Sequence, residues 1–382
     1  MTDPSRRMRD GLFARHIPVA RPFGAGVAEL RCQKSLPAIF SAWNFSMKRR
    51  FLKAVLIATA ILAISAGGHA DAPAELETRS VALSENIKAG DRTGHIRFLG
   101  MLQLPNPTVD GMRFSQPSGL AWDDDDGILY AISDKGFLFH LQPVFENGTL
   151  TGLKLLKALH LRDTGSNKPL KGTRADSEGL DILNGRNGRK GDAELIVSFE
   201  RFPRIVRYRP DGYAIEESPL PAPLDDARMY QDSNKMLESV CADSKLGILT
   251  VPEAPLKGER QGVTRLFSVD GRSWIYPLAT GNRISALECL GNYRVLVLES
   301  NFSGVLGRLE VFLKLATLSP NGPPAESVPV ETAVALDSGK GHQIDNFEGL
   351  AKHRGNRFFI ISDDNDLFIQ RSLLMYFELL DK

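Results

Sequence analysis

The sequence predicts an all-β protein, a β-propeller built from five repeats. The first observation is a short pattern that recurs at spacings of 60, 60, 50 and 60 residues. The second is an apolar run that follows each copy after a turn, and the third is a polar residue that ends each run. Self-similarity at such a period is typical of repeat architectures. The five copies of the pattern are Ser118–Ala121, Glu178–Asp181, Glu238–Cys241, Glu288–Gly291 and Glu348–Ala351.

The apolar runs are the best strand candidates. They hold four to five residues, are rich in Ile, Val, Leu and Phe, and are flanked by Gly, Asn and Asp, which favours strands over helices. Their continuous apolarity indicates burial on both faces, as expected for small sheets that stack around an axis. The runs are Ile128–Ile132, Leu195–Phe199, Ile248–Val251, Val295–Leu298 and Phe358–Ile361.

Further strands complete each repeat. A third strand is expected at Phe137–Leu141, Arg204–Tyr208, Thr264–Val269, Arg308–Leu315 and Leu373–Leu379. A fourth is expected at Leu153–Leu161, Ile215–Leu220, Trp274–Leu278 and Thr332–Leu336. The last repeat lacks a fourth strand, so we expect Ile96–Leu104 to supply it, which would close the ring and leave no free sheet edge.

Two other architectures stay open on the sequence. A divergent sixth blade would occupy Phe302–Ile344, giving six blades rather than five. The other reading is a pair of β-sandwiches or an irregular multi-domain β protein.

The N-terminal region has the pattern of an export signal. Lys48, Arg49 and Arg50 precede an apolar run of 11 residues, Ala54–Ile64, and small residues at 68 and 70 fit a cleavage site. We therefore expect residues 47–70 to be a signal peptide and residues 1–46 to be a start-site misassignment outside the native protein. Residues 71–382 would form a single propeller domain. An uncleaved anchor is the alternative, although the run is short of the roughly 20 residues that span a bilayer.

Composition narrows the class of protein. The chain has 382 residues, with 47 Lys and Arg against 46 Asp and Glu, and such a balance argues against a nucleic-acid partner. Three cysteines exclude a disulfide-dense scaffold and a four-cysteine zinc site. From the signal-peptide pattern we expect a periplasmic or secreted protein. After cleavage of the signal peptide, we expect a monomer with no stable membrane insertion.

The repeats carry acidic residues at two equivalent positions. In a propeller, the same position of each innermost strand meets its counterparts near the axis. Glutamates hold the first position in four repeats, and Ser118 holds it in the first. Up to nine carboxylates would therefore converge on one mouth: Glu178, Glu238, Glu288 and Glu348, followed by Asp134, Glu200, Glu253, Glu299 and Asp363.

Like charges at this density need compensation. A hard divalent cation, above all Ca²⁺, would provide it through carboxylate and amide oxygens. The candidate ligands are Glu178, Glu238, Glu288, Glu299, Asn346, Glu348 and Asp363, with Asn301 and Asn365 as further candidates. Basic neighbours are a second solution: Lys135, Arg201, Arg204, Lys235 and Arg283. A third interpretation is purely structural, with the acids bonded to backbone N–H groups of neighbouring blades.

Several familiar catalytic motifs are absent from the sequence, and one disulfide is left open. The sequence has no Gly-x-Ser-x-Gly elbow, no His-Glu-x-x-His zinc motif and no Walker loop. Cys241 and Cys289 fall on adjacent innermost strands, so a disulfide between them is one of the possibilities that export allows.

Several motifs together resemble a known family. They are Ser118–Trp122, Asp176–Leu180, Val197–Arg201, Asn234–Lys235 with Leu237–Glu238, Leu296–Glu299, and Asp345–Leu350 with Ser362–Asn365. In this order they resemble the exported phytase-like family, described as having esterase-like phytase activity. The resemblance covers roughly Phe98–Leu380.

The resemblance implies an exported propeller that hydrolyses a small phosphorylated substrate such as phytate. By analogy with calcium-dependent propeller phytases, metal ions at the mouth would bridge to phosphate while a carboxylate orients the attacking water. The implied catalytic residues are Glu178, Glu200, Glu348 and Asp363, and the implied substrate contacts are Lys135, Arg201, Arg204 and Lys235. The alternative function is a non-catalytic propeller that binds a ligand or an envelope partner at the same mouth.

Overall fold

The computed structural model describes residues 74–302, 307–320 and 326–381. The segments interpreted as a misassigned start, 1–46, and as a signal peptide, 47–70, lie outside these residues. The described chain is all-β, with only three short 3-10 turns, at Gly172–Arg174, Ala227–Met229 and Ser338–Lys340. Within the described ranges, no helix has the length and apolarity that crossing a membrane requires.

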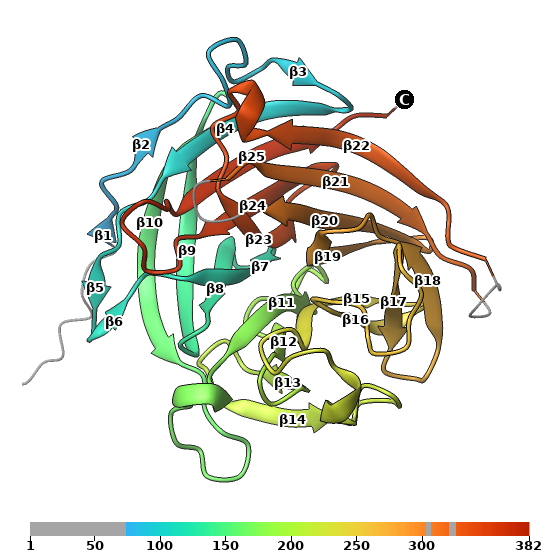
Figure 1. The fold of residues 1–382 in the computed structure, drawn as a ribbon. Coiled ribbons are helices and arrows are strands. Elements are labelled where there is room, and N and C mark those ends of the chain that lie inside the picture. Colours follow the sequence, from blue (N-terminus) through green and yellow to red (C-terminus); the bar gives the residue numbers. More distant parts are fainter. Residues whose placement is uncertain (1–73, 303–306, 321–325, 382) are drawn as a thin grey trace, which may run out of the picture. The chain divides into compact units, whose positions relative to one another are not determined.

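Five antiparallel sheets surround a common axis, as Figure 1 shows. The first blade consists of β7 (Pro117–Asp123), β8 (Ile128–Ser133), β9 (Phe137–Glu146) and β10 (Thr149–His160). The second consists of β11 (Ser177–Leu183), β12 (Glu194–Phe199), β13 (Arg204–Tyr208) and β14 (Ala214–Ser218). The third consists of β15 (Leu237–Asp243), β16 (Gly247–Pro252), β17 (Val263–Ser268) and β18 (Ser273–Pro277).

The fourth blade consists of β19 (Asn282–Gly291), β20 (Arg294–Phe302), β21 (Leu309–Thr317) and β22 (Val330–Asp337). The fifth consists of β23 (Asn346–Lys352), β24 (Arg357–Asp363), β25 (Leu373–Leu379) and the early strand β4 (Ile96–Gln103). The innermost strands contact one another in the order β7, β11, β15, β19, β23 and back to β7. Three smaller strands pair with outer strands of the first and fifth blades: β1 (Ala74–Glu75) with β10, and β2 (Arg79–Ser80) and β3 (Arg92–Thr93) with β4. The strands β5 (Thr108–Val109) and β6 (Met112–Arg113) form a separate hairpin.

The ring closes as the sequence predicts. Strand β4 pairs antiparallel with β25, with Met101 opposite Met375 and Ile96 opposite Leu379. The fold is a five-bladed propeller, so the sixth blade considered at 302–344 is not formed. That stretch contributes the end of β20 and the strands β21 and β22 to the fourth blade, because they pair directly with one another.

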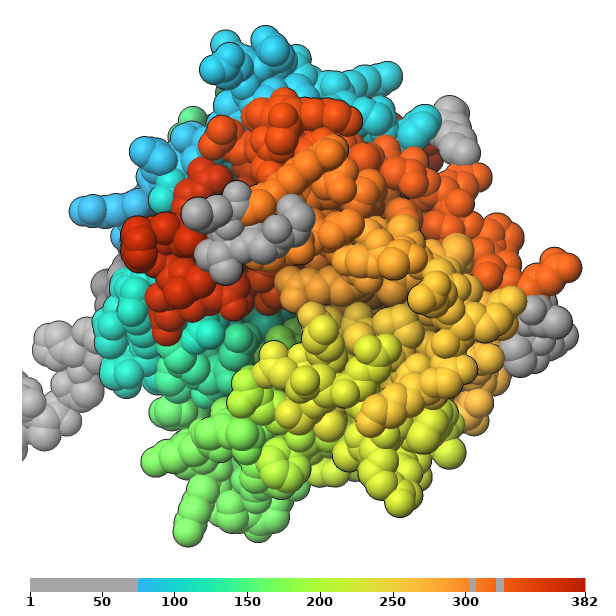
Figure 2. Space-filling view, in the orientation of Figure 1, coloured from blue at the N-terminus to red at the C-terminus, as the bar shows by residue number. Residues whose placement is uncertain are grey.

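The apolar second strands are buried on both faces. In β8, Leu129 and Ala131 belong to the core between the fifth and first blades, whereas Tyr130 and Ile132 belong to the core between the first and second. Each of the five apolar cores lies between two neighbouring blades. Figure 2 shows the blades packed side by side as successive sectors, coloured from teal to red. Continuous apolarity in these runs therefore reflects burial on two sides.

A β-bulge opens every innermost strand and explains the repeated pattern. The pairing of the first two strands shifts register at the same point in each blade. The glycine after the bulged residue lets neighbouring blades approach closely: a Cβ on Gly179 would lie 2.5 Å from Ser198 Oγ and 2.6 Å from the Cα of Ser239. The Glu-Gly pairs thus combine an axial side chain with a close blade contact.

A disulfide joins the third and fourth blades. Cys241 on β15 and Cys289 on β19 are bonded, with their Cα atoms 5.5 Å apart. The pairing that the sequence left open is therefore formed. It ties two innermost strands together directly.

A pH dependence of stability follows from His140. Its side chain is 6% exposed and Nε2 donates to the carbonyl of Pro210 at 2.8 Å. Burial lowers the pKa of His140 to about 4, from 6.5 in an unfolded chain. The unfolded state therefore binds more protons between these values, and stability present above pH 6.5 is lost as the pH falls towards 4.

We expect this loss to reach about 3 kcal/mol at most, since each pKa unit corresponds to about 1.4 kcal/mol. Urea unfolding at several pH values should show a shallower dependence for His140→Gln than for the wild type. The exposed His95→Gln serves as the control and should keep the wild-type slope. Equal slopes for all three proteins would remove His140 as the cause.

Candidate functional site

A polar cavity of about 430 Å³ lies at one end of the propeller axis. The starts of the innermost strands and the ends of the second strands form it. Seven acidic residues line it: Asp134, Glu178, Glu200, Glu238, Glu253, Glu348 and Asp363. Its other polar lining includes Asn234, Lys235, Arg283, Ser300, Asn346 and Asn365. The predicted convergence of equivalent acids is thus present in four of the five blades.

Strand register explains the convergence. Glu178, Glu238 and Glu348 each occupy the bulge of an innermost strand, where Ser118 stands in the first blade. Each acid of the second set directly follows the residue that pairs with the one before the bulge: Asp134, Glu200, Glu253 and Asp363. One geometric position repeated around an axis therefore places these side chains in a common space.

The fourth blade departs from the prediction. Its register shift falls between Ile284 and Ala286, so the bulge residue is Ser285 rather than Glu288. The residue equivalent to Glu200 is Ser300 rather than Glu299, because Ile284 pairs with Glu299. The two serine hydroxyls lie 3.1 Å apart and are buried. The expectation that Glu288 and Glu299 join the ring is therefore wrong.

Glu299 faces away from the cavity, toward the interface between the third and fourth blades. Its side chain is fully buried and accepts hydrogen bonds from Tyr276 Oη at 2.6 Å and Asn282 Nδ2 at 2.8 Å. Lys314 Nζ lies 2.8 Å from Glu299 Oε2. This carboxylate is neutralised within the sheet, so it is a structural group.

Glu288 lies nearer the opposite end of the innermost strands. It lines a separate polar cavity of about 430 Å³ together with Asp181, Arg186 and Lys352. Glu288 Oε2 accepts from the backbone N–H of Lys352 at 2.9 Å. Burial and the charge of Asp181 raise the pKa of Glu288 to about 8. The four residues that start at Glu288 resemble the repeated pattern, but they lie three residues after the true bulge residue, Ser285.

Arg283 is the principal countercharge of the axial cavity. Its guanidinium contacts Glu253 Oε1 at 2.8 Å and Glu348 Oε1 at 3.3 Å. It also donates to Asn346 Oδ1 at 2.5 Å and to Ser300 Oγ at 3.0 Å. The surrounding carboxylates hold the pKa of Arg283 above its ordinary value despite burial. The sequence placed Arg283 only among several basic neighbours, yet it is the cation that the acids share.

Burial and mutual repulsion raise the pKa values of the acids. Burial is the larger cause and the neighbouring carboxylates the second, and together they raise the pKa of Glu178 and of Asp134 well above the usual range. The same causes raise the pKa of Glu200 to about 8 and of Asp363 to about 10. Glu348 rises only to about 6, because Arg283 and Asn346 stabilise its charged form. The cavity therefore holds protonated and ionised carboxyl groups near neutral pH.

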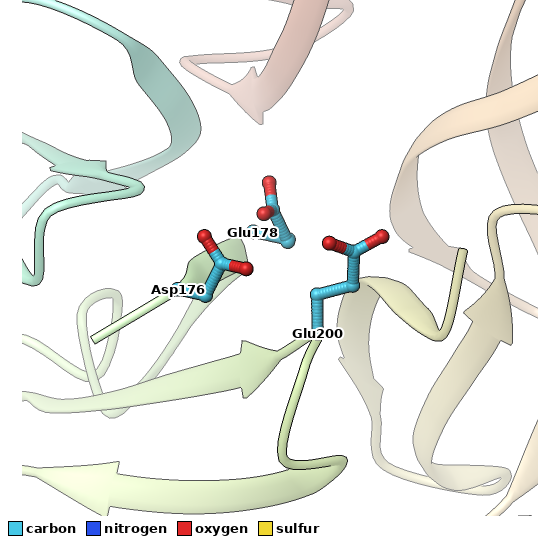
Figure 3. A group of neighbouring side chains, drawn as sticks. All are labelled: Asp176, Glu178 and Glu200. Carbon is cyan, nitrogen blue, oxygen red and sulfur yellow. The ribbon is translucent and has the colours of Figure 1, made fainter. Parts of the chain in front are cut away.

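Two groups of acids have oxygens close enough to share an ion. Asp176, Glu178 and Glu200 form one group, drawn in Figure 3, and Glu200, Glu238 and Glu253 form the other. Within each group the ligand oxygens lie within 4.8 Å of one another. Buried Asp134 Oδ1 makes no hydrogen bond within the described chain. An all-oxygen donor set fits a hard cation such as Ca²⁺. Asp176 was absent from the predicted ligands.

The predicted phosphate contacts divide into two kinds. Lys235 is exposed and lines the cavity. Arg201 is not among the residues that line the cavity, but its Nε lies 2.8 Å from Asp176 Oδ2. Lys135 pairs with Asp366, and buried Arg204 donates to the carbonyl of Arg174 at 2.5 Å, so neither lines the cavity. Arg204 also lies over the ring of Phe199 at 3.7 Å, which makes it a structural residue.

Comparison with known proteins gives one family. The phytase-like family, described as "esterase-like activity of phytase", matches residues 112–366. Among solved structures, the WD40 domain of Pan2 from Neurospora crassa is similar at 11% identity and a TM-score of 0.36. That match covers 76% of this chain and 98% of the Pan2 domain. No curated relative matches the chain.

Loss of Arg283 should destabilise the protein more than loss of a comparable surface arginine. Arg283→Gln leaves Glu253 and Glu348 without their cation, and their side chains are only 12% and 10% exposed. We expect a loss of about 3 kcal/mol at pH 8, where Glu348 is ionised. Urea unfolding would measure it.

Arg207 provides a matched control, because it also contacts two carboxylates and its side chain is 28% exposed against 31% for Arg283. Its partners Glu194 and Glu216 are far more exposed, so Arg207→Gln should cost under about 1 kcal/mol. Equal losses in the two variants would show that the axial charges are not specially dependent on Arg283.

Proposed function

Because the chain belongs to the phytase-like family, we propose that it is an exported hydrolase that cleaves small phosphate esters with the help of a metal ion held in the axial cavity. The observation that carries this proposal is the gathering of seven acidic residues with Arg283 and Lys235 around one cavity. Carboxylates alone would repel a phosphate. A divalent cation held by the carboxylates would in turn attract the phosphate, so acidic and basic side chains could both serve binding.

The ion would be held by residues of the second and third blades. Glu200 is common to both oxygen groups, with Asp176 and Glu178 on one side and Glu238 and Glu253 on the other. We propose Ca²⁺ as the ion, since all the available ligands are oxygens. When bound, such an ion would polarise a phosphate oxygen and make a bound water more acidic.

The chain's own groups would bind the substrate and accept a proton. Arg283 and Lys235 are the cationic groups in the cavity, and we propose that they contact the phosphate oxygens. Glu348, whose pKa is about 6, suits the role of the base that orients the attacking water near neutral pH. Asn346 Nδ2 donates to Glu348 Oε1 at 2.7 Å and so fixes the orientation of this carboxylate.

Export is the second part of the proposal. The Cys241–Cys289 disulfide supports an oxidising compartment, consistent with the signal-peptide pattern of residues 47–70. We therefore propose a periplasmic or secreted location. The cavity volume of about 430 Å³ supports a small phosphorylated molecule rather than a nucleic acid as substrate.

Glu200→Gln should abolish activity. We expect the wild-type protein to release phosphate from phytate or from p-nitrophenyl phosphate in the presence of Ca²⁺. The variant should be slower by roughly 100-fold or more, because a ligand common to both oxygen groups is lost. Phosphate release at fixed pH is the measurement.

Glu288→Gln is the matched control, since Glu288 also lies on an innermost strand but lines the other cavity. It should leave the rate unchanged. No turnover by the wild type with any divalent cation, while ligand binding persists, would favour the non-catalytic propeller instead. Full activity of Glu200→Gln would reject the assignment of Glu200.

Removal of the ion should lower thermal stability. A ligand that binds only the folded state stabilises it by about 2.7 kcal/mol at 100 times its dissociation constant. The melting temperature should therefore rise with added Ca²⁺ and fall with EDTA. Glu200→Gln should lose this response and Glu288→Gln should keep it. An identical melting temperature of the wild type in Ca²⁺ and in EDTA would contradict a bound calcium ion.

A further inference from the structure

Phe302 is the one apolar side chain among the described residues that line the axial cavity. It is the last residue of β20 and is 44% exposed, although phenylalanine is among the residues most often buried. The other lining residues are acidic, basic, amide or hydroxyl side chains, together with Gly281. The cavity therefore offers a ligand an apolar surface at a single place, which β20 fixes.

Strand geometry places Phe302 near Arg283. Side chains two residues apart on a strand point to the same face, so Phe302 shares a face of β20 with Ser300. The pairing of β20 with β21 is regular as far as Phe302, which lies opposite Leu309, so no bulge interrupts this alternation. Ser300 Oγ accepts from Arg283 Nε at 3.0 Å. The aromatic ring is thus carried by a residue whose Cα lies about 7 Å along the strand from that of the arginine's hydrogen-bond partner.

Phe302 faces the fifth blade. Its partner across the sheet, Leu309, belongs to the core between the fourth and fifth blades, and directly paired residues point to the same face of a sheet. The fifth blade lines the cavity with Asn346 and Glu348, the proposed base. The ring therefore lies on the side of the cavity where the attacking water would be oriented.

We propose that Phe302 is a specificity-determining residue, which packs against the alcohol portion of the substrate and selects phosphate esters of aromatic alcohols. The assignment rests on the proposed function, because it takes Arg283 as a phosphate contact. With the phosphate at Arg283, the group on its ester oxygen would lie beside the ring of Phe302. An aromatic group there would bury apolar area and contact the ring directly, whereas a polyhydroxylated or highly phosphorylated alcohol has little apolar surface to bury.

Steady-state kinetics with two phosphate esters test the proposal. The measured quantity is the ratio of kcat/KM for phenyl phosphate to kcat/KM for glycerol 2-phosphate, in the presence of Ca²⁺. Phe302→Ala should lower this ratio about tenfold, because the ring's exposed surface is no longer available to the phenyl group. Phe302→Tyr keeps the ring and should keep the ratio within about twofold of the wild-type value.

Phe202→Ala is the matched control. Phe202 is 46% exposed and follows β12, a second strand like β20, but it does not line the cavity. Its removal should leave the ratio unchanged. An equal fall of the ratio in Phe202→Ala and Phe302→Ala would overturn the assignment, since general loss of exposed apolar surface would then be the cause.

Calorimetric binding of phosphonates separates this assignment from hydrolysis itself, because their carbon–phosphorus bond replaces the ester bond. The wild type should bind phenylphosphonate about tenfold more tightly than methylphosphonate, and Phe302→Ala should lose this difference. Such binding without turnover of any ester would reject the hydrolase but keep the contact of Phe302 with an aromatic ligand. Turnover with an unchanged ratio in Phe302→Ala would keep the hydrolase and overturn the role of Phe302. Failure of the wild type to bind phenylphosphonate, or equal binding of the two phosphonates, would also overturn that role.

Discussion

Crowding of like charge at the axis is the constraint on which the rest of this propeller's chemistry depends. Blade geometry causes this crowding, because the bulge residue of each innermost strand and a residue at the end of each second strand share one small space. Where both are acidic, burial and repulsion raise their pKa values. The folded state can meet this cost by protonation, by a fixed cation or by a bound ion, and the cavity has groups suited to all three.

The fourth blade makes this arrangement asymmetric. Serines stand at both of its axial positions, and Arg283 enters from the start of its innermost strand. Arg283 contacts Glu253 and Glu348, and Arg201 contacts Asp176, whereas within the described chain Glu178, Glu200 and Glu238 have no ion-pair partner. The main countercharge of the cavity therefore comes from the fourth blade. Glu253 connects the two parts, because it contacts Arg283 and also belongs to one of the oxygen groups that include Glu200.

Much of the fold could be predicted from the sequence because burial on two faces leaves a continuous apolar run in every blade. The same reasoning located β4 as the missing fourth strand of the last blade, since an open edge would otherwise remain. The axial acids of four blades followed from repeat spacing alone. Acidic residues at equivalent positions of the repeats were enough to predict that these side chains meet at the axis.

The strand register of the fourth blade could not be predicted from the repeat pattern. Glu288 is followed by Cys, Leu and Gly and so imitates the repeat, whereas the true bulge residue, Ser285, resembles no acidic counterpart. Strand register, set by pairing of Ile284 with Glu299, decides which side chain meets the axis. A shift of one residue turns a side chain to the other face of the sheet, which is why Glu299 packs against Tyr276 of the third blade. The central role of Arg283 was hidden for the same reason.

The interface between the third and fourth blades connects this register to the cavity. The innermost strands β15 and β19 are joined by the Cys241–Cys289 disulfide, and the backbone N–H of Leu287 donates to Ser239 Oγ at 2.9 Å. Both contacts hold β19 against β15, and their β15 residues, Ser239 and Cys241, lie one and three residues after Glu238. Because Arg283 lies at the start of β19, its reach to Glu253 depends on this alignment. The covalent link at one end of the strands thereby supports the charge balance at the other.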